Sequence, residues 1–329
     1  MGRSVRLHAL IICWEAVFPR KTICFGCASI ALLAICGSFA QSDSSAAPRS
    51  AKLDAYEQIL KLHPHDDSAT KGEVTTAIEE ALEAKQAGKN DLALAFLLRA
   101  NYWVPDDAEL LTDTGIQEQA MNLTADADAA LTKAQQLRPG NPKTLYALAR
   151  VKMDLNQTQA SEEAWQAYLA QRPDDASAHF GYGVLLQMLQ RMDQARAEFQ
   201  KSIKLSPQQS ESYYRLGEIA RNAGQDIEAK QYYDQAIEHG PAHAGAWTGL
   251  GILAFNAKKY DEAERDLEKA VQLAPDFQPA RYYHGLTLAR LGRKEDSEKE
   301  LAVAVQLADV ENAHKNQSRR LSKEPYQPQ

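Results

Sequence analysis

Cysteine is missing from most of this sequence. The four cysteines lie within the first 36 residues, at Cys13, Cys24, Cys27 and Cys36. The rest of the chain therefore has no disulfide framework, no zinc–thiolate cluster and no thiol nucleophile. Glycine and proline are also modest, at 17 and 13 of 329 residues, which excludes collagen-like and low-complexity chains. Side-chain packing alone must stabilise the body of the protein.

An excess of positive charge is missing too. The formal net charge is −7, and it becomes −10 when residues 1–40, with four basic residues and one acidic residue, are left out. Nucleic-acid binding depends on neutralising phosphates, and a glycine-rich phosphate loop is absent as well. We expect no nucleic-acid partner.

Residues 1–40 carry the features of an export signal. Arg20 and Lys21 precede an uncharged run over residues 22–40, which ends in Ser38-Phe39-Ala40, with small residues at the two positions that a signal peptidase reads. We expect an exported protein, periplasmic or extracellular. The segment is either cleaved or retained as an anchor in the inner membrane, since nineteen apolar residues can just span a bilayer. The residues before Arg20 are unusual for a signal peptide, and one hypothesis is that translation starts near Val17.

The body of the chain repeats with a period of 34 residues. The period is carried by six prolines: Pro105, Pro139, Pro173, Pro207, Pro241 and Pro275. Positions 12, 24 and 5 residues before each proline hold almost only small residues, Tyr168 being the large exception at the last of these. A unit of this length fits two helices of three to four turns with two short turns.

Each conserved spacing has a physical reason. Small residues such as Gly183 and Ala195 let two antiparallel helices approach closely. The prolines follow the second helix of each unit, which they cannot continue. Helix starts are indicated by Asp106 and Asp107, by Asp174 and Asp175, and by Asn141 before Pro142. The turn inside each unit is predicted at Gly88, Asn122, Asn156, Gly224 and Gly292.

Seven units in register, over residues 74–311, resemble the tetratricopeptide repeat family. The unit from Ala244 to Phe277 is similar to the family pattern at seven positions: Trp247, Leu250, Gly251, Ala263, Leu267, Ala270 and Pro275. The resemblance implies an all-α fold, a right-handed superhelical solenoid of helix-turn-helix repeats. It also implies a concave groove, lined by the first helices, that takes up a peptide or helix of a partner protein.

Two segments flank the repeats. Residues 41–73 are interpreted as a linker plus an N-terminal capping helix, because Leu53, Tyr56, Ile59, Leu60 and Leu62 have helical spacing and stop at Pro64. Residues 312–329 are polar and are interpreted as a short C-terminal cap or tail.

The partner-binding residues are predicted from the first helices. Tyr146, Phe180, Tyr214 and Tyr282 share one position of the repeat, a series that Thr248 interrupts, and charged side chains lie around them at Arg150, Arg215, Glu218 and Arg221. One hypothesis is an aromatic groove with a basic centre that favours an acidic or carboxylate-ended peptide. The alternative is that the aromatic rings only pack between neighbouring first helices.

Catalytic machinery is not expected. The segments outside the repeats are too short for a catalytic domain, and we expect no cofactor and no metal. His63, His65, Asp66 and Asp67 are interpreted as a solvated loop, as are His239 and His243, and His284 as a packed, hydrogen-bonded side chain.

The sequence therefore predicts an exported, non-catalytic protein–protein interaction scaffold, used in envelope assembly or secretion. The alternatives are an accessory subunit of an envelope enzyme complex and a binder of glycans or peptidoglycan. Membrane contact is expected only through residues 22–40, if these are not cleaved.

Overall fold

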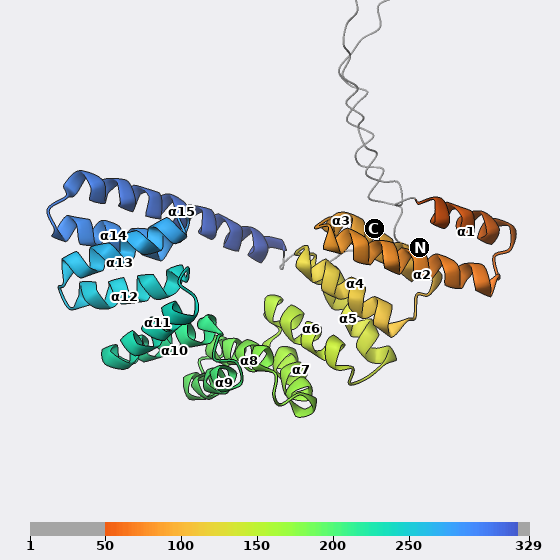
Figure 1. The fold of residues 1–329 in the computed structure, drawn as a ribbon, viewed down its shortest axis with the longest axis horizontal. Helices are drawn as coiled ribbons and strands as arrows, with labels where there is room; N and C mark the ends of the chain where they lie inside the picture. Colours follow the sequence, from red (N-terminus) through yellow and green to blue (C-terminus); the bar gives the residue numbers. More distant parts are fainter. Residues whose placement is uncertain (1–49, 322–329) are drawn as a thin grey trace, which may run out of the picture. The chain divides into compact units, whose positions relative to one another are not determined.

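The computed structural model describes residues 50–321, and side chains up to residue 310. The predicted export segment, residues 1–40, lies outside the described residues, as does the end of the chain from residue 322. All regular elements of the described part are α-helices, so the all-α prediction is confirmed (Figure 1). The helices are α1 Ala51–Leu62, α2 Asp67–Gln86, α3 Asn90–Trp103, α4 Ala108–Ala120, α5 Thr124–Leu137, α6 Pro142–Asp154, α7 Thr158–Gln171, α8 Ala176–Met188, α9 Met192–Leu205, α10 Ser210–Asn222, α11 Asp226–His239, α12 Ala244–Asn256, α13 Tyr260–Leu273, α14 Gln278–Arg290 and α15 Lys294–Leu321.

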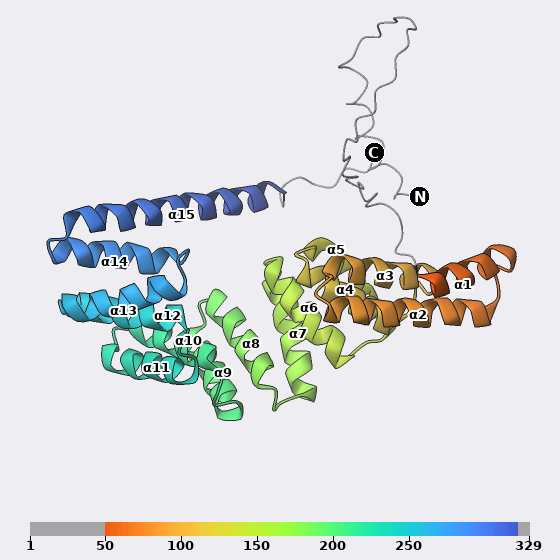
Figure 2. The same ribbon diagram turned by 45° about the horizontal axis from the view of Figure 1, so that its top comes forward.

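Consecutive helices pair into hairpins, from α2 with α3 to α14 with α15 (Figures 1 and 2). Each second helix then packs on the first helix of the next hairpin, as α5 does on α6 and α13 on α14. First helices also contact each other, as α4 does with α6 and α12 with α14. A hairpin that cannot bury its own apolar face is thus covered by its neighbours, which is the packing of a helical solenoid.

The turn inside each hairpin has the same conformation throughout. Gly88, Asn122, Asn156, Gly224 and Gly292 have positive φ angles between 57° and 82°, as predicted. Two further positions on the same 34-residue period, Gln190 and Lys258, have φ angles of 59° and 62° without being glycine or asparagine. In each turn the next amide donates to a carbonyl five residues earlier, as Gly224's neighbour Gln225 does to Ala220 at 2.9 Å. This is the Schellman arrangement, and it satisfies carbonyls at the end of the first helix.

Close helix approach explains the small residues of the repeat. A methyl group added at Gly183 on α8 would lie 2.7 Å from the Cε1 atom of Phe199 on α9, too close for two carbon atoms. Ala195, the matching small residue on α9, has no solvent exposure. The predicted crossing point of the two helices is therefore confirmed.

The predicted helix starts and ends are found as well. Asp107, Asn141 and Asp175 each accept hydrogen bonds from backbone amides of the first turn, at 2.9 to 3.1 Å. The six periodic prolines stand two residues after the last residue of α3, α5, α7, α9, α11 and α13.

Both ends of the repeat region differ in detail from expectation. The expected boundary at residue 74 lies inside α2, which begins at Asp67, and the boundary at residue 311 lies inside α15, which continues to Leu321. The capping helix α1 is present, but only part of its apolar stripe is covered: Leu62 is 76% exposed. Arg99 of α3 holds α1 in place, because it pairs with Glu57 at 3.3 Å and with the buried Glu73 of α2 at 2.5 Å.

Candidate partner-binding groove

A groove of about 560 Å³ opens between α6 and α8. We call it the first-helix groove, because first helices form most of it. Its floor and walls come from α4, α6, α7 and the start of α8: Ile116, Gln119, Pro142, Lys143, Tyr146, Ala147, Arg150, Tyr168, Arg172, Asp175 and Ser177. Tyr146 and Arg150 of the predicted site are therefore brought together in one concave surface.

The Tyr146 ring is fixed by aromatic neighbours on α7. Its centroid lies 5.1 Å from that of Trp165 and 5.3 Å from that of Tyr168, both in edge-to-face geometry. Trp165 is fully buried, whereas Tyr146 remains half-buried, with one side in the groove. Burial raises the pKa of the Tyr146 hydroxyl, so it stays a neutral hydrogen-bonding group at physiological pH.

The one carboxylate in the groove, that of Asp175, already accepts hydrogen bonds from neighbouring residues of the chain. One oxygen of Asp175 accepts from the amides of Ser177 and Ala178 at the start of α8, and the other accepts from the Tyr168 hydroxyl at 2.6 Å. Burial, followed by this hydrogen bond, raises the pKa of Tyr168 to about 12. Asp175 therefore acts as a helix cap and a tether for Tyr168.

Three cations line the groove, and two of them form no ion pair with the described side chains. The third, Lys143, pairs with Asp113 of α4. Arg150 and Arg172 are exposed, and neither forms an ion pair with any side chain described between residues 50 and 310. The groove thus combines an aromatic floor with two guanidinium groups that are free to bind an anionic ligand.

The other predicted cations are neutralised by neighbours on their own helix. Arg215 lies 3.1 Å from Glu211, and Arg221 lies 2.9 Å from Glu218. Glu218 also accepts a hydrogen bond from the Tyr233 hydroxyl of α11. Arg215 and Arg221 therefore do not form the predicted basic centre. The arginines that lack an ion pair with the described side chains are Arg150 and Arg172.

The aromatic side chains that share one repeat position, Tyr146, Phe180, Tyr214 and Tyr282, pack against their neighbours to different extents. Tyr214 packs against His243 at 4.8 Å and Tyr233 at 6.2 Å, and Phe180 lies 5.8 Å from Phe199. Tyr282 is 43% exposed and touches Tyr283. Tyr146 and Phe180 pack on second helices, and Tyr214 packs on both α11 and the start of α12. The rings therefore do not lie only between first helices, as the alternative hypothesis assumed.

Among the groove residues that were not predicted from the sequence, Tyr168 and Arg172 contribute most to its aromatic and cationic character. Tyr168 stands at a repeat position that elsewhere holds alanine or serine, and this departure was the signal available. A tyrosine there cannot fit between the helices, so its ring turns toward Tyr146 and its hydroxyl reaches Asp175.

The histidines differ partly from expectation. His243 is not a solvated loop residue: its Nδ1 accepts from the amide of Ala246, capping α12, and its Nε2 lies 2.9 Å from Glu211. His239 stacks on Tyr213 at 5.1 Å. His284 is packed as predicted, but its Nδ1 has no hydrogen-bond partner, and burial lowers its pKa. Among the side chains described, no cluster of three or more potential metal ligands occurs.

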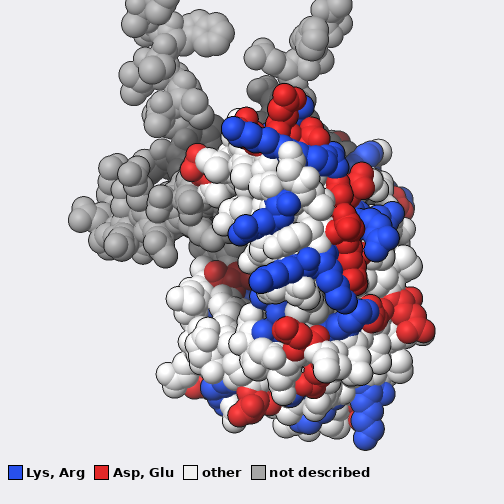
Figure 3. Space-filling view, turned by 90° about the vertical axis from the view of Figure 1, so that its left-hand side faces the viewer, with Lys and Arg blue, Asp and Glu red and all other residues white. Residues whose placement is uncertain are grey.

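The C-terminal hairpins show acidic and basic side chains interleaved (Figure 3). Ion pairs account for several of them: Arg293 bridges to Glu264 of α13, and Arg281 lies 2.8 Å from Glu300. Since acidic side chains lie beside the basic ones there, this face has no field of a single sign to attract a nucleic acid.

Stacked helical hairpins with an open groove along the first helices define a class of repeat proteins that act as protein-interaction scaffolds. Sequence models of the tetratricopeptide repeat match residues 146–210, 198–231 and 244–277. The chain therefore carries tetratricopeptide repeats in these segments, and the described hairpins on either side of them have the same helical architecture. A comparison with curated proteins finds no match.

Solved structures share the fold. A tetratricopeptide repeat protein from Parabacteroides merdae is 19% identical, with a TM-score of 0.59, over 71% of this chain and 93% of that one. Pseudomonas aeruginosa pilF is 18% identical, with a TM-score of 0.56, over 64% and 96%. The Cut9–Hcn1 hetero-tetramer of the APC/C is 16% identical, with a TM-score of 0.59, over 78% and 49%. At these identities the likeness concerns the fold alone.

Proposed function

We propose that this chain is an exported scaffold that binds an acidic segment of a partner protein in the first-helix groove. The observation that carries the proposal is the pair of exposed, ion-pair-free arginines, Arg150 and Arg172, beside the half-buried ring of Tyr146. A carboxylate of the partner gains charge-assisted hydrogen bonds from arginine, while the aromatic surface covers an apolar neighbour.

The proposed site is narrower than the row predicted from sequence. Tyr146 and Arg150 remain in it and Arg172 is added. Phe180, Tyr214 and Tyr282 extend the same repeat position along the first helices, where a longer partner segment would continue. Arg215, Glu218 and Arg221 contribute little, because their charges are satisfied within α10.

A pair of matched peptides tests this proposal. An acidic peptide and its twin with glutamine in place of glutamate are titrated into the purified chain. We expect the acidic peptide to bind more tightly, and the Arg150→Gln, Arg172→Gln double variant to weaken it by roughly ten- to a hundredfold.

The matched control removes two exposed arginines elsewhere, Arg138 on the second-helix end before α6 and Arg290 at the end of α14. This Arg138→Gln, Arg290→Gln variant has the same net charge as the test variant, and it should bind as the wild type does. Equal weakening in both double variants would show a non-specific charge effect, and the first-helix groove would not be the site.

The export part of the proposal rests on residues 1–40 of the sequence. Among the helices of residues 50–321, none has the length and apolar character required to cross a membrane. We propose a periplasmic or extracellular location, with a role in envelope assembly or secretion. Cell fractionation with N-terminal sequencing distinguishes a cleaved signal from a retained anchor, and recovery of the chain in the cytosol with its first forty residues intact would refute export.

A further inference from the structure

A second groove, of about 470 Å³, lies between α11 and α13, with α12 as its floor. We call it the second-helix groove. Ile227 and Lys230 line it from α11, Trp247 and Leu253 from α12, and Lys259 and Asp266 around α13. It is separate from the first-helix groove and does not depend on the function proposed above.

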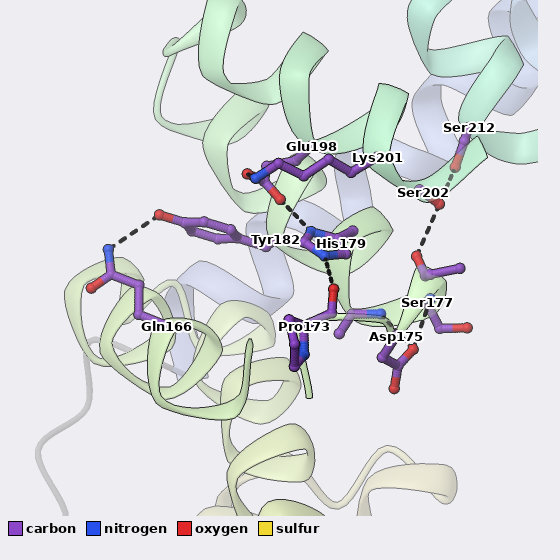
Figure 4. Close-up of polar contacts among 12 residues, drawn as sticks. Gln166, Pro173, Asp175, Ser177, His179, Tyr182, Glu198, Lys201, Ser202 and Ser212 are labelled. Atoms are coloured by element: carbon purple, nitrogen blue, oxygen red, sulfur yellow. Dashed lines mark hydrogen bonds and ion pairs between the residues drawn. The ribbon is translucent and has the colours of Figure 1, made fainter. Parts of the chain in front are cut away.

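Comparison of equivalent repeat positions explains its chemistry. His179, Trp247 and Arg281 occupy the same position on α8, α12 and α14. Each directs a side-chain nitrogen to the carbonyl of the proline six residues earlier, at 2.8, 3.1 and 2.7 Å (Figure 4 shows the bond from His179 to Pro173).

The side chains of histidine and arginine have a further nitrogen that can bond to another group, whereas that of tryptophan has only one nitrogen. The second nitrogen of His179 lies 2.5 Å from Glu198, and that of Arg281 lies 2.8 Å from Glu300 (Figure 4 for His179). Both acids stand nineteen residues after their partners. Asp266 stands nineteen residues after Trp247, and among the described side chains it forms no hydrogen bond or ion pair. Asp266 is therefore a half-buried carboxylate without the side-chain partner that His179 gives to Glu198 and Arg281 gives to Glu300.

A second comparison explains why the groove is open. Between neighbouring second helices, residues 29 apart are bridged three times: Glu162 with Arg191 at 2.7 Å, Arg196 with Gln225 at 3.0 Å, and Glu264 with Arg293. Between α11 and α13 the corresponding residues are Lys230 and Lys259, two cations that cannot form an ion pair with each other. Lys230 instead pairs with Asp234 at 2.8 Å, and Lys259 lies 3.6 Å from Glu262.

The groove therefore offers two complementary features to a ligand. Four acidic residues line it against two lysines, and both lysines are already paired. Ile227 at its edge is 81% exposed, the largest exposure among the large apolar side chains of the described part. A ligand that complements this groove would carry a cation for the acidic residues and an adjacent apolar group for Ile227.

We propose that the second-helix groove binds an arginine side chain of a partner protein, with the guanidinium between Trp247 and Asp266 and an adjacent apolar residue on Ile227. Arginine fits better than lysine, because its planar group can stack on an indole while it donates to a carboxylate.

Two short peptides test this inference: acetyl-Leu-Arg-Leu-amide, and its twin with citrulline, which keeps the shape of arginine but lacks its charge. Binding is followed by the NMR signal of the Trp247 indole N–H, assigned with the Trp247→Phe variant. We expect the arginine peptide to shift this signal, and the citrulline peptide to bind at least about tenfold more weakly.

Asp266→Asn should reduce binding of the arginine peptide by about tenfold, whereas Asp261→Asn, on the same helix but outside the groove, should not. Binding should also weaken below pH 6, because burial and Glu262 raise the pKa of Asp266 to about 6. The other charges facing this carboxyl are Arg265 of α13 and Lys230 and Asp234 of α11.

Equal shifts with both peptides, or unchanged binding in Asp266→Asn, would overturn the inference. So would a dimer of this chain that Asp266→Asn dissociates, since the occupant would then be a second copy. Binding of the acidic peptide to the first-helix groove should be the same in Asp266→Asn and wild type, so failure at one groove is distinguishable from failure at the other.

Discussion

The two grooves of this molecule are built from the same repeated hairpin, yet they present opposite charge. In the first-helix groove, Arg150 and Arg172 form no ion pair with the side chains described for residues 50–310, and the one carboxylate, Asp175, is used as a helix cap. In the second-helix groove, Asp266 has no hydrogen-bond or ion-pair partner in the part of the chain whose side chains are described, and both lysines are paired. The charge that each groove presents to a ligand therefore depends on which of its ionisable groups already form ion pairs or hydrogen bonds within the hairpins.

The same comparison holds between single hairpins. In α8–α9 the acid Glu198 has His179 and Lys201 beside it, whereas in α12–α13 the equivalent Asp266 faces tryptophan. One position thus contributes to stability in one hairpin and is free for a ligand in another. Four substitutions test this contrast.

Glu198→Ala should have the largest effect. It removes the carboxylate beside His179, which is only 6% exposed, and leaves the Nδ1 atom of this buried ring without a partner, while Nε2 keeps its bond to Pro173. We expect the free energy of unfolding to fall by about 3 kcal/mol, measured by urea denaturation. Glu238→Ala, on the exposed side of α11, serves as the control and should change it little. A loss below about 1 kcal/mol would mean that the buried pair adds no stability.

Trp247→Arg should give Asp266 an ion-pair partner within its own hairpin, as Arg281 does for Glu300. The new guanidinium can reach both the Pro241 carbonyl and Asp266, as Arg281 reaches Pro275 and Glu300. We expect binding of the arginine peptide to fall at least about tenfold, since its position is filled from within. Calorimetric titration measures the loss, and circular dichroism checks that the helices persist. Binding that survives this substitution would contradict the assignment of Asp266 as the anchor.

Asp266→Asn should stabilise the free protein. Burial raises the pKa of this carboxyl from 3.8 to about 6, so the folded chain is penalised where Asp266 is ionised, above pH 6. The penalty disappears as pH falls through that window toward 4. We expect the variant to be more stable at pH 7 by on the order of 1 kcal/mol, after allowing for solvent screening, and equal to the wild type near pH 4. Urea denaturation at both pH values measures it. A gain that persists at pH 4 would point to a cause other than charge.

Lys258→Gly should give the smallest effect. Lys258 has a φ of 62°, in the left-handed region where side chains are disfavoured and glycine is not. The variant should gain up to about 1 kcal/mol in thermal unfolding, and Gly224→Ala, at the same turn of the preceding hairpin, should lose about as much. Changes of the same sign in both variants would exclude backbone conformation as the cause.

Much of the fold could be predicted from the sequence because its determinants are local. The turns at Gly88 and Asn122, the caps at Asp107 and Asn141 and the small residue Gly183 each act on neighbouring residues, and the 34-residue period repeats them. The ends were less predictable. The start of α2 is capped by Asp66, which accepts from the amide of Ala69 at 2.8 Å and lies off the 34-residue period, in a segment interpreted from the sequence as a solvated loop.

The candidate site was predicted only in part. Tyr146 and Arg150 could be placed on one face by spacing alone. The removal of Arg215 and Arg221 and the addition of Arg172 required knowledge of which carboxylates lie within reach, since each ion pair depends on rotamers and on neighbouring helices.

The repeat, its helices, its turns and its positions of close approach follow from residue type at fixed spacing, so they can be read from the amino-acid sequence. Which charges remain available to a partner depends on the packing of the helices against each other. An ionisable group is satisfied or free according to the few atoms around it, and those atoms come from helices that are distant in the sequence.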